Sequence, residues 1–419
     1  MKCGIAQARD VKTRMDWYYY IALAAIVSQL VFLFQTHKNY RYAVKKYKRE
    51  RSWYRPRTVL IIPCRGLDSA FQQNITSFFE QDYENYLLWF VVGDESDPAY
   101  DELCRLKDRL SQSSKAQDVQ VFVAGRGRTC SQKIHNLLYC YEKISGDIDV
   151  LAFADSDICV RSNWLSHIVY PLRKAKNGAA SGYRWFIPER NNLASLALSA
   201  MNAKVAQLLG NTRFNQAWGG SMAIRVEVFR KLGLDKIWPK ALSDDLSLSI
   251  AVKKAGLIVT FVPACLVASH EVTTWRNLFE FSRRQFLITR VSAPKTWWFG
   301  LFSSLYSILG IWAAAGLAIY AGVIQNEHLF LFAAVPAVFF VSQLIRAILR
   351  QRMAGKLLGH ERRKMRVACA ADILGFWLWS LLMLILIISS AFGRTICWRG
   401  IRYKLLGPTE TIVEGPQAQ

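Results

Sequence analysis

The sequence has few acidic side chains and lacks the short motifs that mark several large enzyme classes. Its 419 residues include 31 Asp and Glu and six His, against 54 Lys and Arg. No P-loop, GxGxxG or GxSxG pattern is present, which argues against P-loop nucleotidases, dinucleotide enzymes and serine hydrolases. Nine cysteines occur without a CxxC or Cys–His spacing, so a zinc site is not expected.

The excess of positive charge is confined to four segments. Residues 37–57, 283–295, 346–366 and 394–404 together carry the whole net charge of +23, and the rest of the chain is neutral. A strongly basic protein commonly binds nucleic acid or an anionic membrane surface. Because each basic segment borders a long apolar run, the charge indicates a lipid bilayer and no nucleic-acid partner.

Four apolar runs are long enough to cross a bilayer at about 1.5 Å per residue. They are Trp17–Gln35, Trp297–Ile324, His328–Ile345 and Val367–Phe392. A secretory signal is the alternative for the first run, but a basic stretch follows it and no small-residue cleavage site is present. Buried core helices are the alternative for the other three. The chain is expected to contain an N-terminal transmembrane anchor (1–36), a basic juxtamembrane linker (37–57), a globular domain (58–290), a C-terminal transmembrane region (291–393) with a basic loop (346–366), and a basic tail (394–419).

The basic segments predict an orientation and leave one conflict. Lys and Arg mark the cytoplasmic side, so the 37–57 segment places the globular domain of this multi-pass protein in the cytoplasm. A fourth full crossing would put the tail outside, whereas the basic residues of the tail favour the inside. The 367–392 stretch is therefore either a crossing or a re-entrant hairpin, and Asp372 near its start fits a segment lined by protein or water.

Between Arg57 and Phe281 short apolar runs alternate with helical patterns. Residues 58–63, 87–93, 119–124 and 150–154 are predicted strands, and helices fit 98–110 and 132–143. This alternation predicts a doubly wound α/β sheet, in which ligands bind beyond the carboxyl ends of the strands.

Polar residues follow three of these strands. Arg65 comes after the first, Asp94 and Asp97 after the second, and Asp155 and Asp157 after the fourth. Two carboxylates two residues apart can converge on one Mg²⁺ or Mn²⁺, which in turn holds a diphosphate. A solvated acidic turn is the alternative, but an unpaired charge directly after a buried strand is costly.

The glycine turn that contains Trp218, Gly219 and Gly220 is a further candidate. Paired glycines indicate close approach of the backbone to a ligand, and a core tryptophan is the alternative.

Asp244 and Asp245 begin an amphipathic helix that runs to Lys254. The helix needs only one capping side chain, Ser243 or Asp244. Asp245 is therefore free to act as a general base if it faces a cleft.

The chain resembles family 2 glycosyltransferases, most closely the ceramide glucosyltransferase branch, over nearly its whole length. The segments that carry the resemblance are IIPCRGLDSAFQQNITSFFEQDY, GDESDPAYD, SQKIHNL, DSD, SDDLSLSIAVKKAG and CWRGIRYKL. The resemblance implies a GT-A-like, doubly wound mixed sheet domain with transmembrane helices at both ends of the chain.

The resemblance also implies roles for the candidate residues. A nucleotide-sugar would be bound by Pro63, Arg65, Asp94, Asp97, Lys133 and Asp155. Mn²⁺ or Mg²⁺ would be held by Asp155 and Asp157, and Asp245 would be the catalytic base. The acceptor or diphosphate would contact Trp218, Gly219, Gly220, Asp244, Arg283, Arg284 and Gln285.

One motif departs from the family pattern. Family members usually carry Q/R-x-x-R-W before the C-terminal spans, and this chain has Leu287-Ile288 where Arg-Trp is expected. In processive polysaccharide synthases that Trp would stack on the acceptor sugar, so its absence disfavours a synthase. Its role passes to Arg283, Arg284 and Gln285, or these residues form a juxtamembrane patch on anionic headgroups.

The sequence thus predicts a membrane-bound, inverting glycosyltransferase that moves one sugar from a nucleotide-sugar, UDP-glucose or similar, to a lipid hydroxyl. Alternatives are a hopanoid, diacylglycerol or polyprenyl phosphate acceptor, a processive polysaccharide synthase, and a non-enzymatic scaffold. Residues 191–210 are predicted to form an interfacial helix at a lipid portal, with a core helix as the alternative.

Overall fold

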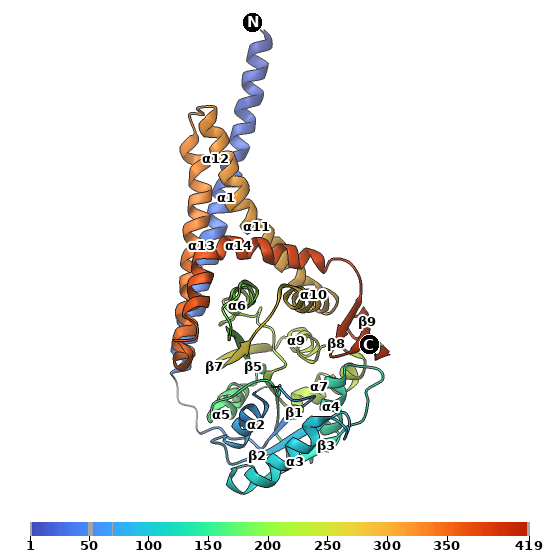
Figure 1. Cartoon of the computed structure of the whole chain (residues 1–419). Helices are drawn as coiled ribbons and strands as arrows, with labels where there is room; N and C mark the ends of the chain where they lie inside the picture. The colour runs from blue at the N-terminus through green and yellow to red at the C-terminus, as the bar shows by residue number, and fades with distance from the viewer. Residues whose placement is uncertain (1, 49–52, 69, 417–419) are drawn as a thin grey trace.

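The computed structural model describes residues 2–48, 53–68 and 70–416 (Figure 1). Figure 1 shows long helices at one end of the molecule, a sheet domain with helices around it at the other, and a small C-terminal sheet at its side. The central part of the expected basic linker, 49–52, lies outside the described residues.

Seven strands form one mixed sheet in the order β3-β2-β1-β4-β6-β5-β7. β1 to β4 pair in parallel, whereas β6 is antiparallel to both β4 and β5. The predicted α/β class and the four predicted strands are confirmed. The strands are β1 Thr58–Pro63, β2 Tyr86–Val92, β3 Asp118–Val123, β4 Val150–Ala154, β5 Asn177–Pro188, β6 Ser221–Arg225 and β7 Ile258–Glu271.

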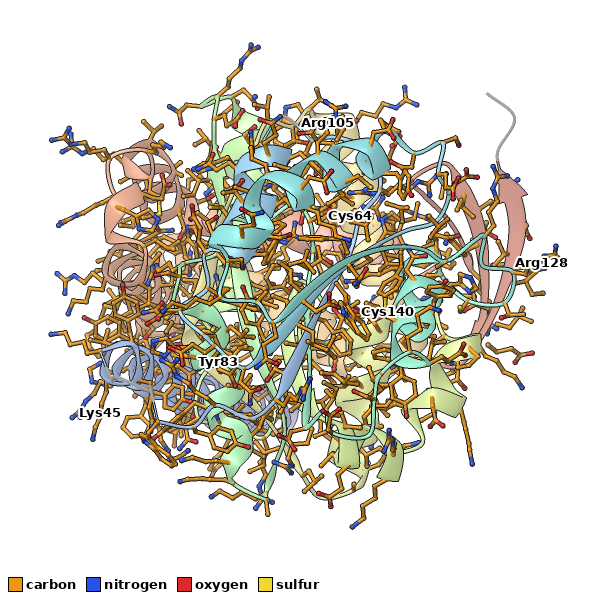
Figure 2. All side chains as sticks on the ribbon, turned by 90° about the horizontal axis from the view of Figure 1, so that it is seen from below. Lys45, Cys64, Tyr83, Arg105, Arg128 and Cys140 are labelled. Atoms are coloured by element: carbon orange, nitrogen blue, oxygen red, sulfur yellow. The ribbon has the colours of Figure 1, made fainter. Side chains whose placement is uncertain are left out.

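The sheet is buried on both faces. Leu60 and Ile62 of β1 enter one hydrophobic cluster, and Val59 and Ile61 enter another, because successive strand side chains point to opposite faces. Seen from below, Figure 2 shows Cys64 and Cys140 inside this layered domain and Arg105 and Arg128 at its periphery. The helices of the domain are α2 Phe71–Phe79, α3 Pro98–Leu110, α4 Gln132–Tyr141, α5 Trp164–Val169, α6 Leu193–Ala206, α7 Val226–Lys231, α8 Leu234–Ile237, α9 Asp244–Lys254 and α10 Trp275–Ser292.

In the part of the chain that the structure describes, four stretches of helix are long and apolar enough to cross a membrane: Tyr18–Tyr47, Pro294–Val323, Leu329–Leu357 and Arg366–Ser389. They belong to α1 (Lys2–Tyr47), α11 (Pro294–Ile308) with α12 (Ala314–Val323), α13 (Leu329–Leu357) and α14 (Arg366–Ser389). A π-helical segment, Leu309–Ala313, joins α11 to α12. The expected basic loop 346–366 differs from the structure in its first half, where α13 continues to Leu357.

Both ends of α14 are held against the sheet domain. Met365, just before the helix, packs in a cluster with Trp185 of β5. At the other end, Arg283 and Arg290 of α10 donate hydrogen bonds to backbone carbonyls in residues 389–393. The helix is unbroken, which contradicts the re-entrant hairpin, one of the two alternatives for this stretch. It runs crosswise to α1 and α13 above α6 and α10 (Figure 1).

The basic tail folds as a three-stranded antiparallel sheet of β8 (Thr395–Trp398), β9 (Ile401–Gly407) and β10 (Glu410–Pro416). Tyr403 and Leu405 of this sheet pack against Leu242, Leu287 and Ile288 of the sheet domain. The tail therefore lies on the same side of the long helices as the sheet domain.

Candidate active site

The carboxyl ends of β1, β2 and β4 meet at one edge of the sheet. β6 runs antiparallel to β4, so the turn before β6 lies at the same edge, where the Asp155 amide donates to the Gly220 carbonyl at 3.3 Å. A cavity of about 1550 Å³ opens here. Its walls extend from Asp94 and Asp155 to side chains of α11, α13 and α14, so one cavity joins the sheet edge to the long helices.

Helix α6 forms part of the cavity wall. It lies between the sheet and α14, and most of its side chains, including Ser199 and Ala203, are buried. Met201 and Asn202 line the cavity. The predicted helix is present, and its surroundings are those of the core-helix alternative more than of an exposed interfacial helix.

Asp155 and Asp244 share the ammonium group of Lys133. Its Nζ lies 2.7 Å from Asp155 Oδ1 and 3.2 Å from Asp244 Oδ2. Burial alone would raise the pKa of Asp155, but Lys133 and Arg184 outweigh it and hold that pKa below the ordinary value. For Asp244 burial prevails and raises the pKa to about 6. Asp155 is therefore ionised at neutral pH, whereas Asp244, with a pKa of about 6, changes its protonation state just below neutral pH.

Arg184 of β5 is a site residue that the sequence did not reveal. Its Nη2 lies 3.3 Å from carboxylate oxygens of both Asp155 and Asp157, and its guanidinium lies 4.7 Å from the centre of the Trp218 ring. Only the sheet topology brings it there, and no spacing in the sequence signals it. The acid pair predicted to hold a metal ion thus already has a cation beside it.

The donor set is compatible with a divalent cation. Asp155 and Asp157 line the same cavity, and Mg²⁺-type ions are commonly held by one or two carboxylates plus substrate phosphates. Within 2–48, 53–68 and 70–416, no group of three or more His, Cys, Asp or Glu could hold a metal ion. The remaining ligands of such an ion would have to come from a bound diphosphate and water.

Gly219 and Gly220 leave room for the acidic network. A Cβ at Gly219 would collide with Asp244 Oδ2 and Lys133 Nζ, and a Cβ at Gly220 would collide with the Trp218 ring and Asp155 Oδ2. Both glycines thus lie close to side chains of the protein itself, and the predicted approach to a ligand stays a prediction.

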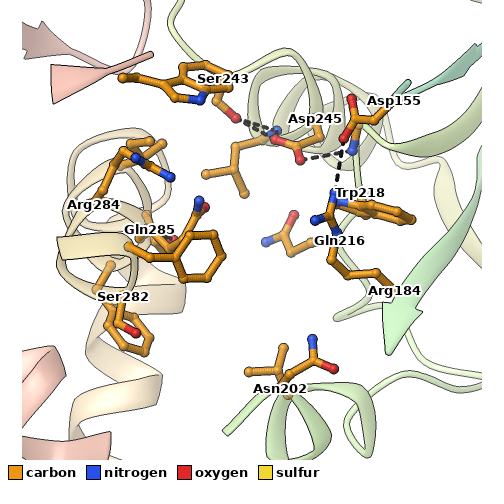
Figure 3. A pocket seen from close by; sticks show the side chains of 18 of the residues that line it. Asp155, Arg184, Asn202, Gln216, Trp218, Ser243, Asp245, Ser282, Arg284 and Gln285 are labelled. Carbon is orange, nitrogen blue, oxygen red and sulfur yellow. Dashed lines mark hydrogen bonds and ion pairs between the residues drawn. The ribbon is translucent and has the colours of Figure 1, made fainter. Parts of the chain in front are cut away.

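Asp245 is fixed by three hydrogen bonds and points into the cavity (Figure 3). Its Oδ2 accepts from the Gly219 amide at 3.0 Å, and its Oδ1 accepts from the Ser243 hydroxyl at 2.5 Å and the Leu246 amide at 2.7 Å. Ser243 also caps α9 by accepting from the Leu246 amide at 3.2 Å. Ser243 is therefore the capping residue of α9. The Asp245 carboxylate is held in one position at the cavity wall.

The ends of β1 and β2 and the residues that follow them line the cavity. Pro63 and Arg65 come from β1 and its loop, and Asp94 and Asp97 from the loop after β2. Asp97 Oδ1 accepts from the Gly66 amide at 2.8 Å and the Ala99 amide at 2.9 Å, so this oxygen caps α3 and holds the β1 loop. The backbone hydrogen bond from Ser96 lowers the pKa of Asp94.

Helix α10 contributes only part of the expected acceptor set. Arg284 and Gln285 line the cavity and face Asp245 and Arg184 across it (Figure 3). Arg283 instead donates to the carbonyls of Ser389 and Phe392 at the end of α14.

The C-terminal sheet completes the cavity wall beside the residues that follow β1. Trp398, Arg399 and Gly400 line the cavity at the β8–β9 turn, and Arg399 Nη1 donates to the Arg65 carbonyl at 2.6 Å. Arg399 has φ 49°, a backbone conformation that non-glycine residues seldom adopt. The CWRGIRYKL segment was recognised in the sequence, but no role was assigned to it.

Comparison with known proteins shows the family of the chain and finds distant structural neighbours among solved proteins. Residues 18–410 match the model of the family described as Glycosyl transferase family 21. The mannosyltransferase PcManGT from Pyrobaculum calidifontis, solved with GDP-Man and Mn²⁺, shares 15% identity at a TM-score of 0.43 over 88% of this chain and 97% of its own. A crystal structure of GalNAc-T7 with UDP, GalNAc and Mn²⁺ shares 15% identity at a TM-score of 0.36 over 57% of this chain and 51% of its own. Both are too distant to assign a ligand or a residue role.

Proposed function

Since the chain belongs to glycosyl transferase family 21, we propose that this glycosyltransferase moves a single sugar from a nucleotide-sugar, UDP-glucose or a similar donor, to the hydroxyl group of a membrane lipid. The observation that carries the proposal is the cavity that joins the acidic sheet edge to α11, α13 and α14. A polar donor can enter at one end of it and an apolar acceptor at the other.

The donor end is assigned to the residues at the sheet edge. The nucleoside is placed beside Pro63, Arg65, Asp94 and Asp97. Lys133 and Arg184 carry positive charge next to the carboxylates of Asp155 and Asp157, which suits a site that must hold a diphosphate leaving group.

Asp155 and Asp157 would hold Mn²⁺ or Mg²⁺. When bound, such an ion neutralises the charge that develops on the leaving diphosphate. Lys133 and Arg184 contribute to the same neutralisation from the protein side, because both already lie at these carboxylates.

Asp245 is the proposed general base. It takes the proton from the acceptor hydroxyl as that oxygen attacks the anomeric carbon, and the single displacement inverts the configuration. The Gly219 amide, the Ser243 hydroxyl and the Leu246 amide hold the carboxylate in place for this step.

The acceptor is proposed to lie between Asp245 and α10. Trp218, Arg284 and Gln285 line this part of the cavity with Phe286. Ile288, at the Trp position of the family's Arg-Trp pair, lines the cavity with an aliphatic side chain and offers no aromatic stacking surface, which disfavours the processive synthase.

The function test is an acceptor screen. Membranes containing the protein are incubated with several UDP-sugars and a lipid mixture, and the lipid products are analysed by mass spectrometry. We expect a hydroxyl-bearing lipid to gain the mass of one sugar, in a reaction abolished by EDTA. A ladder of masses would favour the synthase, and sugar found only on a lipid phosphate would favour the polyprenyl phosphate acceptor. Absence of any lipid product, together with absence of thermal stabilisation by UDP and Mn²⁺, would contradict the proposal.

The proposed topology has three crossings with the catalytic domain in the cytoplasm. α1, α11 with α12, and α13 cross the membrane, and α14 lies along its inner surface, because both of its ends contact the sheet domain. The basic tail and the 37–57 segment then lie together on the side that Lys and Arg favour.

Epitope insertion checks this topology. A tag after Asn326, in the α12–α13 turn, should be stained by antibody on intact cells, and a tag after Pro408, in the exposed β9–β10 turn, only after permeabilisation. Staining of the Pro408 tag on intact cells would mean that α14 crosses the membrane.

A further inference from the structure

A buried polar cluster lies at the end of the cavity that faces the long helices, and the proposed reaction does not use it. Lys204 of α6 and Gln343, Arg346 and Arg350 of α13 all line this end. In the part of the chain that the structure describes, Asp372 of α14 is the acid that pairs with the cluster.

Arg350 is neutralised by Asp372. Its Nε donates to Asp372 Oδ2 at 2.7 Å, its Nη2 donates to Oδ1 at 2.5 Å, and its Nη1 donates to Gln207 Oε1 at 3.3 Å. Gln351 adds a hydrogen bond of 2.7 Å to the same carboxylate. The Arg350–Asp372 pair therefore carries no net charge, and the Asp372 carboxylate is occupied and does not pair with the other cations of the cluster.

Arg346 and Lys204 remain without a counter-ion. Arg346 Nε donates to Thr36 Oγ1 at 3.1 Å, and Lys204 Nζ donates to the Phe376 carbonyl at 3.1 Å and to the Ser380 hydroxyl. Neither has an ion-pair partner within 4.0 Å among the described residues. Burial, followed by the nearby Arg350, lowers the pKa of Lys204 well below its ordinary value, because its ammonium group has no counter-ion, and an anion bound beside it would favour the charged form again.

The cluster also contains an unused donor. The Gln343 side chain is 6% exposed, and its Nε2 has no hydrogen-bond partner among the described residues. Arg346 and Lys204 therefore face the same cavity with neutral hydrogen-bond acceptors and no counter-ion, and the Gln343 amide has an N–H without an acceptor among the described residues. Buried charge without a counter-ion is costly. An anion with several acceptor oxygens would satisfy all three groups.

We propose that this end of the cavity binds the phosphate group of an anionic phospholipid from the bilayer. Arg346 and Lys204 pair with the phosphate oxygens, and the Gln343 amide donates to one of them. The cavity wall next to the cluster is formed by Tyr306, Phe376 and other apolar side chains of α11 and α14, which suit an acyl chain. The proposal rests on the proposed membrane placement and does not depend on the sugar transferred.

Native mass spectrometry of the full chain released from lipid nanodiscs tests the site. The nanodiscs contain equal amounts of phosphatidylglycerol and phosphatidylcholine, and the bound lipids are counted by mass. We expect the wild type to retain phosphatidylglycerol preferentially. Arg346→Gln and Lys204→Gln should each reduce this preference roughly fivefold or more, since each removes one cation from the site.

Arg352→Gln is the matched control, because Arg352 is on the same helix and is exposed. It should retain the wild-type preference, as should Arg346→Lys. If Arg346→Gln does not give folded protein, Lys204→Gln carries the test. Equal retention of phosphatidylglycerol by the wild type and Lys204→Gln would overturn the proposal. So would complete displacement of the lipid by inorganic phosphate, which would indicate a site for the free anion. Because binding is measured, a failed transfer assay would not affect this result.

Discussion

Asp245→Asn should reduce sugar transfer by about 10² to 10⁴-fold, the usual cost of removing a positioned general base. The substitution removes the proton acceptor and changes the side-chain shape little. One of the two backbone donors, the Gly219 or the Leu246 amide, would face the new amide NH₂ in place of an oxygen. That loss should lower the free energy of unfolding by only about 1 kcal/mol, so the protein should remain folded.

The measurement is the initial rate in membranes, together with the thermal midpoint of each variant. Asp108→Asn is the control, because it makes the same change on the exposed face of α3 and should leave the rate unchanged. Asp245→Asn should also leave UDP-dependent thermal stabilisation intact, since the donor is bound by other residues. Near-normal transfer by Asp245→Asn would remove Asp245 from the role of base.

Local signals in the sequence predicted the first half of the sheet closely. β1 and β4 have the predicted bounds because each is a short, continuous apolar run, and α3 begins at Pro98 after the Asp97 cap. β5 and β7 were not predicted. They mix Gly, Ser, Arg and His with apolar residues, and they become strands through pairing with each other.

The charged residues of the site also divide into those with a local sequence signal and those placed by long-range strand pairing. Asp155, Asp157 and Asp245 follow apolar strands or begin a helix, so local context indicated them. Arg184 reaches Asp155 only because β5 lies next to β6 in the sheet, and no linear pattern encodes that neighbour.

Lys204 and Arg346 are visible in the sequence as charged residues beside apolar runs, but the sequence did not predict that they line a buried cavity. Arg346 was counted as part of a cytoplasmic basic loop, whereas it lies on α13 and lines the cavity. Lys204 is a lone cation in the apolar 191–210 stretch, and such a residue could have indicated a buried charged site. The motif resemblance pointed to family 2 glycosyltransferases with their ceramide glucosyltransferase branch. The family shown is glycosyl transferase family 21, and that branch is consistent with it.

Asp155→Asn should reduce the maximal rate on the order of 10² to 10³-fold, a loss typical of removing one electrostatic contact to a transition state. Asp155 is the anion shared by Lys133 and Arg184, and it is a proposed ligand of the divalent cation. Loss of the carboxylate leaves the two cations at the proposed diphosphate position but removes one of the two proposed metal ligands, so that Asp157 alone remains. Metal-dependent transfer should therefore fall, whereas binding of UDP without metal should not weaken.

Calorimetry of UDP binding, with and without Mn²⁺, separates this explanation from simple unfolding. The wild type should bind UDP more tightly when Mn²⁺ is present, and Asp155→Asn should lose most of that difference. Asp157→Asn is the matched variant: in the structure Asp157 pairs with Arg184 and not with Lys133, and its side chain is 30% exposed against 23% for Asp155. Its smaller share in the charge network predicts a smaller loss of rate. If Asp155→Asn still binds UDP more tightly with Mn²⁺, the metal ion is held by other ligands. Arg184 and Lys133 would then be the protein groups that neutralise the diphosphate.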